Sequence, residues 1–112
     1  EESRKLVRQD WVNFRNTDIL FPMIYHKFYR WEDSMVETAT RQGVEELKAA
    51  GNPAVLCSGL FVGHVPKERI QEFFGYAVNG GSKGICLFSL EGINRTEGYW
   101  EALGEAVKEF KR

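Results

Sequence analysis

Three uncharged, mainly apolar runs recur along this chain at a nearly constant interval. They cover residues 19–25, 54–61 and 84–90, so successive runs begin roughly 30 to 35 residues apart. Runs of this length that are rich in β-branched and aromatic residues are typical of strands buried on both faces. The segments between them carry apolar residues three and four positions apart, which is the spacing of an amphipathic helix. The pattern therefore predicts parallel strands joined by helical crossovers.

Four helices are expected around these strands, over residues 1–15, 31–50, 66–78 and 94–110. In the second helix, Asp33 or Ser34 is the expected cap, and Met35, Ala39 and Leu47 mark the buried stripe. The resulting order is α-βα-βα-βα, an α/β chain with three sequential parallel strands and all its helices on one side of the sheet. The rival is a doubly wound, flavodoxin-like domain, which requires about five strands and a polar loop at a switch point.

Composition places the chain among ordinary globular domains. Its 112 residues are enough for a single domain, residues 1–112, with 43% hydrophobic and 28% charged residues. The net charge is −1 and the basic residues are scattered, which argues against a nucleic-acid partner. No run of 18 apolar residues is present, so no membrane-spanning segment is expected. Because the chain begins inside a helical pattern, we expect it to be a fragment of a longer protein.

The sequence predicts neither a metal nor a cofactor. Cys57 and Cys86 each lie inside an apolar run, where the simplest interpretation is a buried, reduced thiol. A disulfide between them requires neighbouring strands with suitable geometry. Neither His26 nor His64 has metal-ligand spacing to the cysteines. The glycine-rich turn at residues 80–82 precedes a strand, whereas phosphate-binding loops follow one and open a helix.

Three segments of the chain resemble the last third of glycoside-hydrolase-like TIM barrels. These segments are Gln9-Asp10-Trp11, Pro22-Met23-Ile24-Tyr25 after Asp18, and Gly84-Ile85-Cys86-Leu87-Phe88-Ser89. They are similar in particular to a largely uncharacterised family of bacterial cell-envelope proteins with such barrels. Met23-Ile24-Tyr25 is also similar to the sixth strand of chitinase-like hydrolases, although His26 stands where that family has an aspartate.

The resemblance implies that the three strands are strands six to eight of a partial (β/α)8 barrel. The parent protein would be a glycoside hydrolase acting on a poly- or oligosaccharide, located in the periplasm, at the cell surface or outside the cell. In many such barrels a key carboxylate comes from strand four, which would lie upstream of Glu1. The fragment alone would then be inactive. The alternative is a non-catalytic barrel domain that binds carbohydrate or acts as a scaffold.

Candidate site residues follow the three strands, because the carboxyl ends of parallel strands meet at one edge of a sheet. Glu91 is the only carboxylate immediately after a strand and is the catalytic candidate, with an ion pair to Arg95 as its structural alternative. The expected carbohydrate-binding residues are Tyr25, His26, Tyr29 and His64.

Self-association of the isolated chain is also expected. Three strands that are apolar on both faces leave one face exposed when helices cover only the other.

Overall fold

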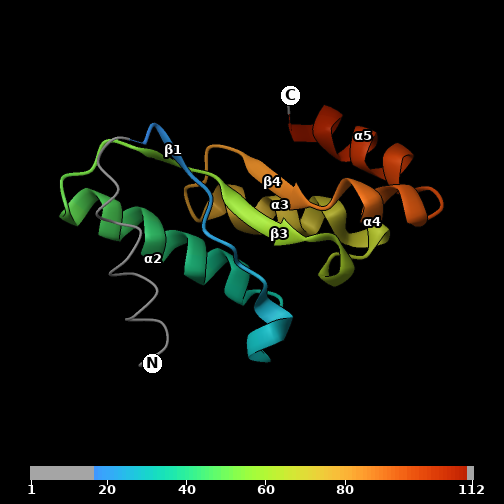
Figure 1. Cartoon of the computed structure of the whole chain (residues 1–112), viewed down its shortest axis with the longest axis horizontal. Coiled ribbons are helices and arrows are strands. Elements are labelled where there is room, and N and C mark those ends of the chain that lie inside the picture. Colours follow the sequence, from blue (N-terminus) through green and yellow to red (C-terminus); the bar gives the residue numbers. More distant parts are fainter. Residues whose placement is uncertain (1–16, 111–112) are drawn as a thin grey trace.

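The computed structural model describes residues 17–110, so the helix expected over residues 1–15 lies outside the described part. The strands are β1 (Ile19–Leu20), β2 (Val55–Leu56), β3 (Ser58–Phe61) and β4 (Ile85–Phe88). The α-helices are α2 (Met35–Ala49), α3 (Ile70–Asn79), α4 (Leu90–Arg95) and α5 (Tyr99–Phe110), and the 3-10 turns are η1 (His26–Tyr29), η2 (Val62–His64) and η3 (Lys67–Arg69). The chain is therefore a mixed α/β structure (Figure 1).

The strands pair in parallel, as the sequence predicts. β1 pairs with β2, β3 pairs with β4, and an isolated bridge joins Met23 to Gly59. Backbone hydrogen bonds continue between these pairs, because the Cys57 N–H donates to the Leu20 carbonyl and the Gly59 N–H to the Pro22 carbonyl, both at 2.9 Å. Residues 19–24, 55–61 and 85–88 thus lie beside one another in sequential order, within small parallel sheets.

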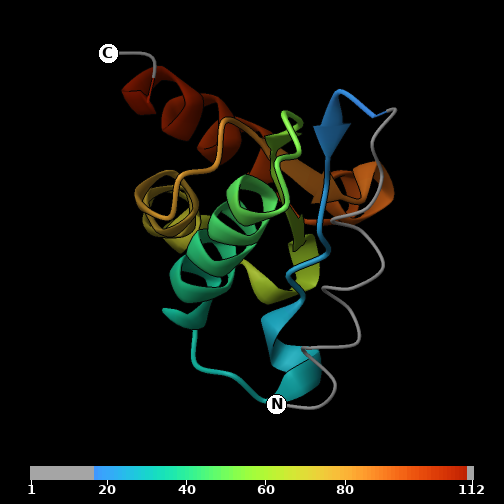
Figure 2. The ribbon, with the colours of Figure 1, turned by 90° about the vertical axis from the view of Figure 1, so that its left-hand side faces the viewer.

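Helices α2, α3 and α5 lie on the same side of these strands, as Figure 2 shows. Alternate strand residues point toward the helices and are buried, as Leu20, Leu56 and Leu60 are. α2 contacts α3, and α3 contacts α5, so these three helices form a single layer. The main core lies between this layer and the strands, around Leu60 and Phe73.

The buried stripe of α2 differs from the expected one. The structure buries Val36, Thr40, Gly43 and Leu47, whereas Met35 and Ala39 are only half-buried. Thr40 is fully buried because its hydroxyl forms a 2.9 Å hydrogen bond with that of Ser58 on β3. The prediction is confirmed at Leu47, and Ala39 packs against the core, but the centre of the buried stripe lies at Val36 and Thr40 because a polar residue takes a core position.

The segment after β4 is helical, whereas a loop was expected there. α4 begins at Leu90, and the Ser89 hydroxyl caps it by accepting a 3.3 Å hydrogen bond from the Gly92 N–H. The peptide bond between Phe88 and Ser89 is cis. The last helix starts at Tyr99, later than the start at residue 94 that the apolar spacing predicts. A serine directly after a strand is itself a helix-start signal, and here Ser89 caps α4.

Candidate functional site

Aromatic rings gather at the carboxyl ends of the strands. We call this cluster the aromatic mouth, and it consists of Tyr25, Phe28, Phe61, His64 and Phe88. Tyr25 and Phe28 come from η1 and the residue before it, Phe61 ends β3, His64 lies in η2, and Phe88 ends β4. The ring centroids of Tyr25 and Phe61 are 5.4 Å apart, those of Phe28 and His64 are 4.6 Å apart, and those of Phe61 and Phe88 are 6.2 Å apart. Such spacings are those of packed aromatic pairs.

An ionic network that includes the buried His26 supports the mouth. The ring of His26 is 5.5 Å from that of His64 and is 1% exposed. Its Nε2 lies 2.8 Å from Oδ1 of Asp33, and Arg69 holds the other oxygen of the same carboxylate. Arg69 also contacts Glu72, so the network links η1 to the start of α3. Because these groups hold one another, η1 is fixed against the helix layer.

The protonation of this network follows from its contacts. The hydrogen bond from Arg69 lowers the pKa of Asp33, and the His26 hydrogen bond and the charges of both partners lower it further, although burial opposes them. An ionised carboxylate only accepts hydrogen bonds, so at neutral pH the His26 Nε2 carries the hydrogen and donates it to Asp33. The network therefore orients His26 and occupies Asp33.

His64 is the least satisfied polar group of the mouth. It is 8% exposed, and its Nδ1 is buried without a hydrogen-bond partner in the described part of the chain. Burial lowers the pKa of His64, and the charges of His26 and Lys27 add to that effect. His64 is therefore a neutral imidazole at neutral pH.

The mouth is suited to binding a neutral, partly apolar ligand. Burial raises the pKa of Tyr25, and the nearby Cys86 adds to it, so the phenol keeps its proton and can donate a hydrogen bond to a ligand. Phe28 is 65% exposed and Phe88 is 56% exposed, so both rings keep surface open to solvent although Phe88 also stacks on Phe61. Aromatic faces with a few hydrogen-bonding groups are found in small-molecule sites.

The structure brings together three of the predicted site residues and separates two. Tyr25, His26 and His64 lie within the mouth or directly beneath it. Tyr29 stacks on Trp31, with centroids 4.9 Å apart. The Glu91 side chain is 69% exposed on α4 and forms an ion pair with Arg95.

Sequence reasoning missed the three phenylalanines of the mouth and the charged partners of His26 below it. Phe61 and Phe88 lie in the apolar runs and are predicted only as strand residues, and Phe28 has no predicted role. Asp33 was interpreted only as a helix cap, and Arg69 was not considered. A carboxylate near the end of one βα loop and an arginine in the next were the available signal, because both loops emerge at the same edge.

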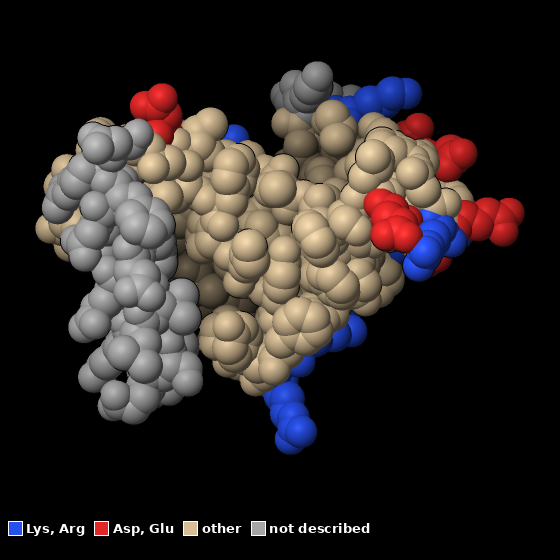
Figure 3. Space-filling view, viewed as in Figure 1, with Lys and Arg blue, Asp and Glu red and all other residues tan. Residues whose placement is uncertain are grey.

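The face of the strands opposite the helices is uncharged. We call it the open face, and its side chains are Ile19, Phe21, Met23, Val55, Cys57, Phe61, Cys86 and Phe88. Figure 3 shows this side of the molecule, where charged groups lie around the edge and not at the centre. Met23 is 72% exposed and Phe21 is 50% exposed, so this apolar surface is in contact with solvent.

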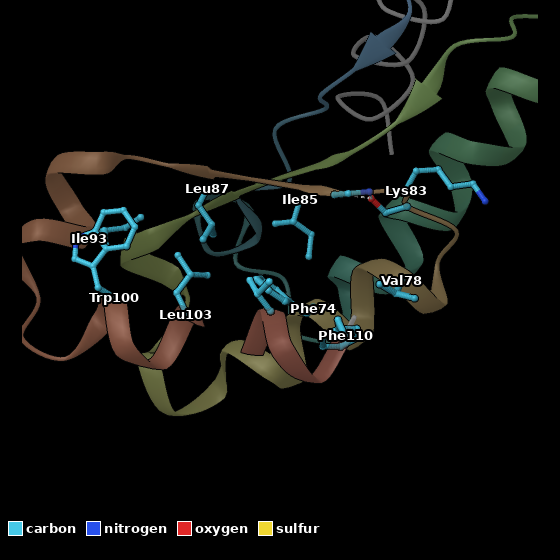
Figure 4. A pocket seen from close by; sticks show the side chains of 12 residues that line it. Phe74, Val78, Lys83, Ile85, Leu87, Ile93, Trp100, Leu103 and Phe110 are labelled. Atoms are coloured by element: carbon cyan, nitrogen blue, oxygen red, sulfur yellow. Dashed lines mark hydrogen bonds between the residues drawn. The ribbon is translucent and has the colours of Figure 1, made fainter. Parts of the chain in front are cut away.

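A hollow of about 560 Å³ lies on the other side of β4, between α3 and α5 (Figure 4). Its walls are aliphatic and aromatic, with Lys83 at one end, and include Phe74, Ile85, Leu87, Trp100, Leu103 and Phe110. The hollow lies on the helix side of the strands, apart from the aromatic mouth, and its lining residues do not take part in the mouth.

Within residues 17–110, no three His, Cys, Asp or Glu side chains are placed so as to hold a metal ion. None of the helices described there is long and apolar enough to cross a membrane. No protein-family model, curated protein or solved structure matches the chain.

Proposed function

We propose that the chain is the C-terminal part of a glycoside-hydrolase-like (β/α)8 barrel and that the aromatic mouth binds part of a carbohydrate. The observation that carries this proposal is the position of the mouth, at the carboxyl ends of parallel strands in sequential order. In barrels of this kind the βα loops at those ends form the ligand site.

The open face supports the barrel. A barrel interior is filled by layers of side chains, many of them branched and apolar, that alternate with residues facing the helices. Leu20 and Leu60 face the helices, while Phe21 and Phe61 belong to the open face, so both strands show that alternation. The missing upstream strands of a parent protein would cover the open face.

The chemistry of the mouth supports a carbohydrate ligand. Sugar rings present C–H groups on their faces, which pack on the exposed ring surfaces of Phe28 and Phe88, and hydroxyls at their edges, which accept from Tyr25.

Glu91 remains the proposed acid or base of the parent enzyme. It follows β4 and therefore lies at the correct edge, but it must leave Arg95 to reach a ligand. Hydrolysis requires two carboxylates that flank the scissile bond. Asp33 is held by His26 and Arg69, so the chain alone is expected to bind and not to hydrolyse.

The ion pair between Glu91 and Arg95 favours the second candidate, a non-catalytic carbohydrate-binding domain. If Glu91 stays paired with Arg95 in the parent protein, the mouth provides binding without catalysis. A longer protein that includes the upstream strands separates the two candidates. For an enzyme, Glu91→Gln reduces turnover far more than Glu97→Gln, which changes a matched surface residue; equal behaviour of the two variants removes Glu91 from the site.

Carbohydrate binding can be tested on the chain itself. Backbone amide spectra recorded with soluble oligosaccharides of β-linked glucose or N-acetylglucosamine should show shifts confined to η1, η2 and the end of β4. Phe28→Ala should weaken this binding several-fold, at about 1 kcal/mol per aromatic contact. Phe110→Ala is the matched control, because Phe110 is also an exposed phenylalanine but lies on α5. Absent shifts, or equal loss in both variants, would contradict a carbohydrate site at the mouth.

The open face also supports self-association of the isolated chain. Six large side chains of this face and the mouth are 38% to 72% exposed, namely Ile19, Phe21, Met23, Phe28, Val55 and Phe88. Side chains of this size offer roughly 200 Å² each, so together they expose roughly 600 Å². That area approaches the roughly 800 Å² that each partner contributes to a standard interface. We therefore expect two copies to pair through this face.

A further inference from the structure

Three sulfur-containing side chains surround one glycine on the open face. Met23 is bridged to Gly59, and Gly59 pairs with Cys86, so these residues form a single row across the strands. Gly59 has no side chain, and the backbone of residues 22–23 lies close against it: a Cβ there would be 3.0 Å from the Pro22 carbonyl oxygen and 3.5 Å from the Met23 Cα. Cys57 precedes Gly59 by two residues and therefore points to the same face.

The Cys57 thiol leans toward the strand that carries Cys86. Its Sγ lies 3.1 Å from the position that a Cβ would occupy on Gly84, the residue two before Cys86. Burial raises the pKa of Cys57, and the nearby Cys86 raises it further. Both cysteines are free thiols, half-buried at Cys57 and exposed at Cys86. The two thiols therefore share one small region that solvent reaches from the Cys86 side.

The register suits a bridging ion better than a disulfide. Ser58 pairs with Ile85, so Cys57 is opposite Gly84 and is only a diagonal neighbour of Cys86. A diagonal neighbour on a parallel strand lies one strand spacing (about 4.8 Å) across and two residues (about 6.6 Å) along, so the Cβ atoms are roughly 8 Å apart, whereas a disulfide requires roughly 3.8 Å. A metal ion between two sulfurs adds two bonds of roughly 2.3 Å each, which spans the wider separation.

We propose that Cys57, Cys86 and Met23 bind a soft monovalent metal ion, Cu(I). Thiolate and thioether sulfurs are the ligands that select Cu(I), whereas the carboxylate and imidazole groups that many divalent ions prefer do not gather here in the described part of the chain. Each thiol releases its proton on binding, so one Cu(I) replaces two protons and no electron is transferred.

The test is a competition between the reduced chain and a chromophoric Cu(I) chelator under anaerobic conditions. We expect one Cu(I) per chain. Cys57→Ser and Cys86→Ser should each weaken binding by more than the roughly 10- to 100-fold that loss of an outer-shell partner costs. Met23→Leu should weaken it less. Met35→Leu is the matched control, since Met35 is the only other methionine and lies on α2.

Circular dichroism of each variant, compared with the wild type, excludes loss of fold as the cause. X-ray absorption should show sulfur ligands only. Wild-type affinity in Cys86→Ser, equal affinity for Zn(II), or one Cu(I) shared by two chains would each overturn the site. The proposal does not depend on the carbohydrate function, because its ligands lie on the strands and outside the mouth.

Discussion

The two faces of the strands have similar composition but different environments. On the helix side, Leu20, Leu56 and Leu60 are at most 7% exposed. On the open face, Phe21, Met23 and Phe88 are at least half exposed. The strands thus carry residues suited to burial on both sides, while residues 17–110 cover one side only. The difference agrees with the proposed barrel, in which further strands would close the sheet over the open face.

The largest expected effect is a difference in unfolding free energy between a variant of the helix-facing side and a variant of the open face. Leu60→Ala removes a 1% exposed side chain from the core and should lower the free energy of unfolding by about 3 kcal/mol. Met23→Ala on the open face should change it by less than about 0.5 kcal/mol. Urea unfolding of both variants makes the comparison, and similar losses would mean that the open face is already packed.

A smaller effect concerns the polar pair inside the covered face. Thr40→Val leaves the Ser58 hydroxyl without its Thr40 partner and should cost about 1–3 kcal/mol. The double variant with Ser58→Ala should recover part of that loss, because the two hydroxyls are coupled. Val55→Thr adds the same kind of group to the open face and should be nearly neutral. A full double-mutant cycle by urea unfolding measures the coupling, and additive losses would argue against it.

The fold class could be predicted from the sequence because three uncharged runs at regular spacing favour parallel strands. The full set of buried residues on α2 could not be predicted, because Thr40 and Gly43 look unsuited to a core. Thr40 became buried through Ser58, a partner 18 residues away that no local pattern reveals. The α4 helix was missed because six residues are too short for a periodic signal, although its serine cap was present.

The smallest effect should appear at the mouth as a pH dependence. The pKa of His64 is lowered from 6.5 in the folded chain, so above pH 6.5 its neutral form contributes its full stability. As the pH falls below 6.5, the unfolded chain binds a proton that the folded chain does not, and that stability is lost. The free energy of unfolding should therefore fall more between pH 7.5 and pH 5 for the wild type than for His64→Asn. Parallel curves would show that His64 titrates alike in both states.

Only the part of the candidate site that directly follows the strands could be predicted from the sequence. Tyr25, His26 and His64 follow strands and do converge, since the parallel topology fixes their edge. Glu91 and Tyr29 also follow strands or their turns, but local partners set their directions. Arg95 lies four residues after Glu91 on the same helix, and Trp31 lies beside Tyr29, so nearby contacts determined both orientations.

The most direct test of the proposal that the open face is an uncovered barrel interior is the solution mass of the isolated chain. Light scattering during gel filtration, with thiols reduced and metals chelated, should show a mass that rises from monomer to dimer with concentration. A hydrophobic dye should bind to the monomer. Replacing both Phe21 and Phe88 with Lys should abolish dimer and dye binding while the circular dichroism is retained. A monomer at every concentration that binds no dye would contradict the account.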